Sequence, residues 1–193
     1  MIMTLLALVL GILTWSLLEY VIHRFLGHSK GATKNPFGAE HTAHHSRGNY
    51  FAPSWKKGLA AVVFAAMVLP LASLVAGFEL GLAYTGGLIG FYITYEALHR
   101  ILHVYEGFGP FGRWARRHHF FHHFHDPKKN HGVTSPLWDL VFGTYHRVNA
   151  PVEVPAKLAM QWLTDPATGE VKRHLSNSFA LRGATKKLTG SAA

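Results

Sequence analysis

Two long stretches of this chain contain almost no charged side chains, and they limit the folds that are open to it. Residues 1–22 carry one charge, at Glu19, and residues 58–98 carry only Glu79 and Glu96. About 20 apolar residues in an α-helix are enough to cross the hydrocarbon core of a bilayer. A soluble domain does not collect its apolar residues in this way. We therefore predict an all-α integral membrane protein.

The apolar stretches divide into three predicted helical spans, near residues 2–22, 58–77 and 81–102. We expect the turn between the second and third spans at residues 76–81, where glycines surround an isolated glutamate. Pro70 should kink the second span. A secretory signal peptide is the alternative for the first span, but that segment lacks a basic start and a small-residue cleavage site.

The basic residues indicate which ends of the spans face the cytoplasm. All 19 Lys and Arg lie within residues 24–57 and 100–193, outside the apolar stretches. Because an excess of Lys and Arg marks cytoplasmic segments, we place both regions there and the N-terminus outside. The same bias accounts for the formal net charge of +9 without a nucleic-acid partner.

A chain of 193 residues has room for one domain. We expect a membrane domain over residues 1–150, in which the histidine-rich segments 23–57 and 103–146 form a helical cap on the cytoplasmic side. A short helix is expected near residues 39–46. Residues 151–193 show weak periodicity and are expected to form a tail that is mobile in part.

The histidines have the spacing of metal ligands. Fifteen are present, and ten of them fall in four clusters, two of which have the pattern HxxHH. Helix positions i, i+3 and i+4 lie within an arc of about 100°, so each HxxHH motif presents three imidazoles on one face. The chain has no cysteine, which excludes iron–sulfur clusters and thiolate zinc sites. The ten motif histidines are His23, His28, His41, His44, His45, His99, His103, His119, His122 and His123.

The four clusters lie at the cytoplasmic ends of predicted spans or in cytoplasmic segments, so they can meet in one layer. Ten imidazoles are too many for one ion, since zinc takes three or four protein ligands, and two ions with about five ligands each would fit. His23 and His28 are about 140° apart on an ideal helix, so either the helix unwinds at Gly27 or the two serve different metals. Imidazole suits iron, zinc, copper and nickel alike.

Several motifs occur in the order found in a known family. Residues 15–28, WSLLEYVIHRFLGH, closely resemble the opening motif of the fatty acid 2-hydroxylases. The HxxxH pair at 99–103, the HxxHH motif at 119–123 and the segment GVTSPLWDLVFGT at 132–144 follow in the same order. Over roughly residues 12–146 the chain thus resembles the membrane fatty acid hydroxylase/sterol desaturase superfamily.

The resemblance implies a di-metal centre, functionally two iron ions, that uses dioxygen and external electrons to hydroxylate a lipid chain from the bilayer. Zinc is a further expected occupant in purified or crystallised protein. The resemblance also implies that the ten motif histidines are the ligands, with no catalytic residue beyond them. Eukaryotic members often carry a fused cytochrome b5 domain, for which we find no room, so we expect a separate donor: a ferredoxin, cytochrome b5 or reductase. Because the family commonly has four spans, we expect three to four here.

Three carboxylates are candidates for hydrogen bonds to the metal-binding histidines, without binding the metal themselves. Glu19 and Glu96 precede His23 and His99 by about one helical turn, and a carboxylate in a low-dielectric interior needs such a partner. Snorkelling to the interface is the alternative for both. Asp139 lies in the segment at 132–144 that resembles the family, and we assign it the same role. Four histidines outside the motifs, His118, His125, His131 and His146, are expected at the surface or beside the ligands. His174 is expected to have no role in the site.

Three other functions remain open. A carotenoid or sterol hydroxylase or desaturase belongs to the same superfamily, but the carotenoid enzymes have a third motif with its histidines five apart and lack the segment at 134–144. A non-redox metal transporter usually binds its ions near the bilayer midplane, between repeated halves that this sequence lacks. A b-type haem protein needs only a pair of axial histidines for each ring.

Overall fold

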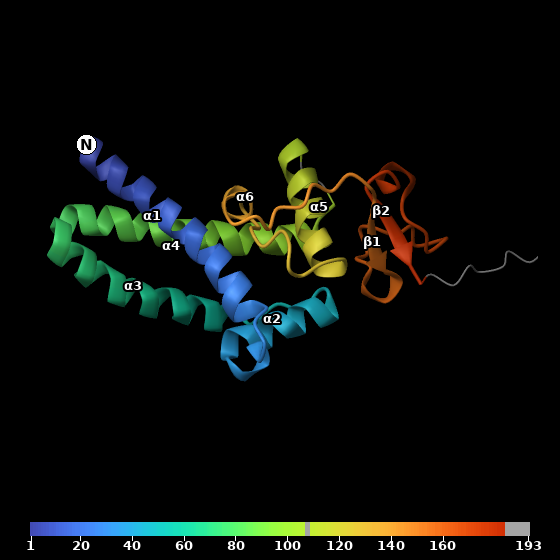
Figure 1. Cartoon of the computed structure of the whole chain (residues 1–193), viewed down its shortest axis with the longest axis horizontal. Helices are drawn as coiled ribbons and strands as arrows, with labels where there is room; N and C mark the ends of the chain where they lie inside the picture. Colours follow the sequence, from blue (N-terminus) through green and yellow to red (C-terminus); the bar gives the residue numbers. More distant parts are fainter. Residues whose placement is uncertain (107–108, 184–193) are drawn as a thin grey trace, which may run out of the picture.

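In the computed structural model, residues 1–106 and 109–183 are described, and they form a mostly helical protein (Figure 1). In chain order the elements are α1 (Ile2–Val21), α2 (Pro36–Arg47), α3 (Ser54–Ala76), α4 (Phe78–Val104), α5 (Pro110–Phe124), α6 (Leu137–Val141), β1 (Val152–Pro155) and β2 (Phe179–Arg182). A π-helical turn, Ile22–Gly27, continues α1. Among the described residues there are also three short 3-10 helices, Ala32–Lys34, Ala156–Leu158 and Arg173–Leu175.

Helices α1, α3 and α4 occupy the positions of the three predicted spans. Two helical segments of the described chain, Ile2–Gly27 and Ser54–Ala76, are long and apolar enough to cross a membrane. Helix α4 has 27 residues and packs against both α1 and α3 (Figure 1). The number of spans stays a prediction.

Helices α1 and α4 approach closely at two glycines. A Cβ atom added to Gly11 would lie 2.0 Å from the carbonyl oxygen of Tyr84, and one added to Gly87 would lie 2.1 Å from that of Leu8. Only glycine permits such contact between backbones, and small residues serve this purpose between membrane helices. This crossing fixes the relation between the helix that leads to His23 and the helix that carries the 99–103 pair.

A single residue separates α3 from α4. Gly77 has φ +84°, a conformation that favours glycine, and it lies within the predicted turn at residues 76–81. The chain stays helical through Pro70. The turn and the N-terminus lie at one end of the long helices, and α2 and α5 lie toward the other (Figure 1).

Helix α2 is longer than the predicted helix at residues 39–46. The Asn35 side chain accepts a hydrogen bond of 2.7 Å from the Gly38 amide, and Pro36 occupies the first turn. Both features favour the start of a helix. Gly48, with positive φ, follows the last residue.

Residues 151–183 form a small unit that contains a two-stranded parallel sheet, with Val152 opposite Phe179. The all-α prediction is therefore corrected to a mostly helical fold with one small sheet, because this segment buries side chains against α5 instead of remaining an open tail. The tail predicted to be mobile in part was residues 151–193, and its last ten residues, 184–193, lie outside the described part. The core that the unit shares with α5 consists of Phe120, Phe124, Val152, Val154, Met160, Trp162, Leu163 and Phe179.

Candidate metal centre

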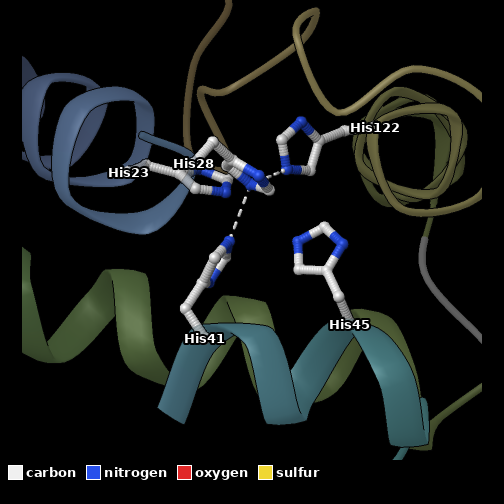
Figure 2. Close-up of side chains that lie close together, drawn as sticks. All are labelled: His23, His28, His41, His45 and His122. Atoms are coloured by element: carbon white, nitrogen blue, oxygen red, sulfur yellow. Dashed lines mark hydrogen bonds between the residues drawn. The ribbon is translucent and has the colours of Figure 1, made fainter. Parts of the chain in front are cut away.

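The ten motif histidines come together in two groups of five, and each group could hold a metal ion. Within a group, one nitrogen from each ring lies within 4.8 Å of every other. The first histidine group is His23, His28, His41, His45 and His122, whose rings surround a common space (Figure 2). The second histidine group is His44, His99, His103, His119 and His123.

The two HxxHH motifs are each divided between the groups. In α2, His41 and His45 belong to the first group and His44 to the second. In α5 the division is reversed, since His119 and His123 belong to the second group and His122 to the first. Positions i and i+4 of a helix are about 40° apart, whereas i+3 lies about 60° away on the other side of i. Each motif therefore serves two adjacent sites.

A π-helical turn explains how His23 and His28 reach the same group. The turn spans Ile22–Gly27, and His28 follows it directly. Because π-helical hydrogen bonds run from i to i+5, residues five apart come to one face. The rings of the pair lie 5.2 Å apart in one group, which contradicts the alternative that they serve different metals. The helix instead departs from α-helical winding up to Gly27, in line with the other alternative. A Cβ atom at Gly27 would lie 2.9 Å from the His41 ring.

The two groups adjoin each other. The rings of His45, in the first group, and His123, in the second, stack in parallel with centroids 3.9 Å apart. Within the second group, Nε2 of His103 lies 3.0 Å from Nε2 of His119. Within the first, Nε2 of His28 lies 2.8 Å from that of His41 and 2.9 Å from that of His122 (Figure 2).

Many of these ring nitrogens are buried and have no hydrogen-bond partner among the described residues. Buried polar atoms are nearly always paired, so a cluster of unpaired nitrogens indicates that another partner belongs there. Imidazole nitrogens bind iron, zinc and copper ions, and the residues present therefore fit a metal in each group. The unpaired atoms are Nε2 of His23, His44, His45 and His99, Nδ1 of His103 and His119, and both ring nitrogens of His123.

Burial favours the uncharged form of several motif histidines. Burial lowers the pKa of His28 to about 4, with the nearby His131 adding to the effect, and burial lowers the pKa of His44 to about 4 as well. Burial, followed by the neighbouring histidines, holds the pKa of His45 and His122 well below the ordinary value. A metal ion binds the neutral imidazole, so these rings are in the required form at neutral pH.

Backbone carbonyl groups orient three of the rings. Each ring donates from Nδ1, which fixes the tautomer and leaves Nε2 free for its group. The pairs are His23 with the carbonyl of His131 at 2.5 Å, His44 with that of Tyr50 at 2.6 Å, and His122 with that of Lys129 at 2.7 Å.

Glu19 forms hydrogen bonds with a distant loop, whereas the sequence predicted His23 as its partner. Its carboxylate accepts hydrogen bonds from the Val133 amide at 2.5 Å, from the Thr134 amide at 3.0 Å and from the Thr134 hydroxyl at 2.7 Å. The same loop carries His131, whose carbonyl accepts the bond from His23. Glu19 is thus linked to the first group through this loop, and the described hydrogen bonds include none between Glu19 and His23.

Glu96 also departs from the prediction. Its carboxylate forms an ion pair with Lys57, and the Tyr92 hydroxyl donates to the Lys57 carbonyl at 3.2 Å. The predicted hydrogen bond to His99 is absent among the described contacts. Glu96 therefore joins the start of α3 to α4.

Asp139 is buried and anchors the loop before α6. It accepts hydrogen bonds from the amides of His131 at 2.9 Å and Gly132 at 2.8 Å, and from the Thr144 hydroxyl at 2.7 Å. Burial alone would raise the pKa of Asp139, but hydrogen bonds from His118, from Thr144 and from the backbone lower it to about 2. Asp139 therefore remains ionised and supports the carbonyl that orients His23.

The histidines outside the motifs divide into two kinds. His118 and His131 are buried, and His125 and His146 are exposed. The ring of His131 lies 5.2 Å from that of His122, closer to the first group than the sequence indicated. Its place depends on Glu19 and Asp139, which are distant in the sequence, so spacing gave no signal of it. His174 forms an exposed hydrogen bond with the Glu106 carboxylate at 2.5 Å.

A cavity of about 720 Å³ lies against both groups. Among its lining residues are His41 of the first group and His44 and His99 of the second. Its walls are mostly apolar side chains of α1, α3 and α4, and it lies within the usual size of ligand sites, about 300–1,000 Å³. The wall residues include Trp15, Ile22, Ala60, Phe64, Met67 and Ile89, and the polar ones include Glu40, Lys56, Lys57 and Glu96.

The chain is similar to known proteins. The model of the fatty acid hydroxylase family matches residues 8–144. The chain is 35% identical over 147 residues to the dihydroceramide fatty acyl 2-hydroxylase FAH2 of Arabidopsis thaliana, covering 72% of this chain and 60% of that protein. It is 34% identical over 149 residues to the ceramide very long chain fatty acid hydroxylase SCS7 of Saccharomyces cerevisiae, covering 74% of this chain and 38% of that protein.

A solved structure is also similar. It is that of full-length Scs7p, in which only the hydroxylase domain is visible, with a TM-score of 0.59 and 30% identity over 77% of this chain and 59% of that one. The chain spans less than two thirds of the length of these relatives. The family suggested by the motifs is confirmed, and the chain belongs to the fatty acid hydroxylase family.

Proposed function

We propose that this chain is a membrane-bound di-iron oxygenase that hydroxylates a lipid acyl chain, using dioxygen and external electrons. The observation that carries the proposal is an apolar cavity that touches both histidine groups. Two iron ions, one held by each group, would supply the activation of dioxygen and the attack on an unactivated C–H bond. The relatives named as fatty acyl and ceramide hydroxylases support this assignment.

The chain itself would hold the metals and position the substrate. The first and second histidine groups would each hold one ion with neutral imidazoles, and the stacked pair His45 and His123 would keep the two sites adjacent. Outside these ten residues we assign no catalytic group. Glu19 and Asp139 would act by anchoring the loop whose carbonyl orients His23.

The cavity would take the acyl chain along its apolar walls. Phe64, Met67 and Ile89 would exclude water from the part that lies between the helices. Two ion pairs, Lys56 with Glu40 at 2.6 Å and Lys57 with Glu96, mark the polar end of the cavity at the start of α3. A lipid held with its head at this end would present the carbons near the head to the histidines, as hydroxylation at position 2 requires.

The positive-inside bias supports a histidine layer on the cytoplasmic face. Substrate would then enter from the bilayer, and electrons would come from a separate soluble or membrane-bound donor. A ferredoxin, a cytochrome b5 or a reductase would fill this role.

Lipid analysis of a host that expresses the protein tests the proposal. Wild-type protein supplied with iron and a reductase system should produce hydroxylated acyl chains, and His44→Ala and His122→Ala should not. His174→Ala is the matched control, because that histidine lies outside both groups. Unchanged acyl lipids would contradict the proposal, and new sterol or carotenoid products would assign the chain to another branch of the superfamily.

A further inference from the structure

We propose that the C-terminal unit, residues 151–183, positions the second histidine group through Trp162 and Arg116. This unit lies beyond residues 8–144, which the family model matches. The inference rests on the proposed metal centre, since it assigns positioning residues to one of its two sites. It is carried by four sets of contacts among the unit, helix α4 and helix α5.

The first contact joins the unit directly to a member of the second group. The indole Nε1 of Trp162 donates a buried hydrogen bond of 2.7 Å to the carbonyl oxygen of His103. His103 lies in the last turn of α4, where helix carbonyl groups lack partners within the helix. Trp162 therefore holds the backbone from which the His103 ring projects.

The second contact secures the end of the same helix. The Arg116 guanidinium, on α5, donates to the carbonyls of Leu102 at 2.8 Å and Glu106 at 2.7 Å, and also to that of Tyr105. A cation at the C-terminus of a helix also complements the helix dipole. Arg116 thus ties α5 to the end of α4.

The third contact covers this tie. The guanidinium carbon of Arg116 lies 4.4 Å from the centroid of the Trp162 ring, within the range of a cation–π interaction. Arg116 is buried, so the indole excludes water from its hydrogen bonds to the carbonyls. One tryptophan of the C-terminal unit therefore contacts both the His103 carbonyl and the arginine that secures α4.

The fourth contact fixes α5. Phe120 and Phe124 belong to the core of the C-terminal unit, and the rings of Phe120 and Trp162 lie 6.1 Å apart. The adjacent residues His119 and His123 belong to the second group. Helices α4 and α5 together supply four of the five members of that group, but only His122 of the first. Displacement of the unit should therefore affect the second group more strongly.

Trp162→Phe tests the inference, because it removes the indole N–H and keeps an aromatic ring. Trp138→Phe is the matched control, since the Trp138 indole donates a similar bond of 2.8 Å to Ser16 Oγ. Metal-free proteins in detergent are titrated with Fe(II) and with Co(II), whose visible spectrum reports the ligand field. We expect two ions in the wild type and in Trp138→Phe. In Trp162→Phe one ion should bind about tenfold more weakly, as is typical when support for a ligand is lost.

Hydrogen exchange of the metal-free proteins provides a second readout. Amide protection at the end of α4 should fall in Trp162→Phe and stay unchanged in Trp138→Phe. Arg116→Lys keeps the charge but cannot reach three carbonyls with one planar group, so it should give the same results and provides the test if Trp162→Phe fails to fold.

Three results would overturn the inference: wild-type affinity for both ions in Trp162→Phe, equal weakening of both ions, or the same change in Trp138→Phe. A wild-type protein that binds no ion would instead contradict the proposed function. Hydrogen exchange at the end of α4 would still decide whether Trp162 holds that helix.

Discussion

Gly86 and Gly87 are neighbours on α4 with opposite surroundings, and the difference gives a sharp test of the helix crossing. A Cβ atom at Gly87 would lie 2.1 Å from the carbonyl oxygen of Leu8, on α1, whereas a Cβ atom at Gly86 would meet nothing within 4 Å. Alanine at either position gains the same helix propensity, up to about 1 kcal/mol. Only alanine at position 87 collides with a neighbour.

The size of the effect follows from the contact. Ordinary van der Waals contact with a Cβ atom begins at 3.4 Å, so α1 must move by more than one ångström at this point. The obstructing atom belongs to backbone and cannot rotate away. Overpacking of this kind costs about 1–3 kcal/mol, and because the propensity gain cancels between the variants, Gly87→Ala should be less stable than Gly86→Ala by that amount.

The displacement should also reach the metal centre. Helix α1 leads to His23, and α4 carries His99, so both groups lose a correctly placed ring. A misplacement of about 1 Å can lower a rate about 100-fold. Unfolding in mixed micelles and hydroxylated product per mole of protein are the measurements. A Gly87→Ala protein as stable and active as Gly86→Ala would refute the reasoning.

Three further results are expected. His44→Ala and His122→Ala should each lower the metal content and abolish product. Both proteins should stay in the membrane fraction, because apolar burial and not metal holds the helices there. His174→Ala should change neither the metal content nor the amount of product. Glu19→Ala should lower the free energy of unfolding by roughly 3 kcal/mol, since it leaves one buried and two part-buried donors without an acceptor, and Glu19→Gln should lower it less; equal stability of all three proteins in a denaturation series would rule this out. The metal-free protein should lose stability as the pH falls from about 6.5 toward 4, because His28 and His44 take up protons near pH 6.5 when unfolded but only near pH 4 when folded; a Tm independent of pH over this range would show that the rings are not buried as described.

The long helices and the histidine layer could be predicted because both depend on local spacing. Apolar stretches located α1, α3 and α4, and the i, i+3, i+4 pattern located α2 and α5. Helix α3 begins at Ser54, four residues before the predicted span at 58, because Lys56 and Lys57 pair with Glu40 and Glu96 and allow the helix to continue through charged residues. The ends of elements thus depended on partners that the sequence does not identify.

Features that depend on distant partners could not be predicted. Glu19 binds a loop more than 100 residues away, so one helical turn of spacing from His23 suggested the wrong neighbour. The β1–β2 pair joins residues 152 and 179 in parallel and has no short connection that would signal it. At Ile22–Gly27 the sequence indicated an unwound helix as one of two alternatives but not its π-helical form, because angles calculated for an ideal α-helix separated His23 from His28.

The division of the HxxHH motifs between the groups determines how each part of the protein acts on the metal centre. Helices α2 and α5 each contribute to both groups, so rigid helical geometry fixes the separation of the two sites. The first group is then completed only by the end of α1, through His23 and His28, and the second only by the end of α4, through His99 and His103. Forcing α1 away from α4, as in Gly87→Ala, should therefore weaken metal binding at both groups. Loosening the C-terminal unit at Trp162 releases the end of α4 alone, and should weaken binding mainly at the second.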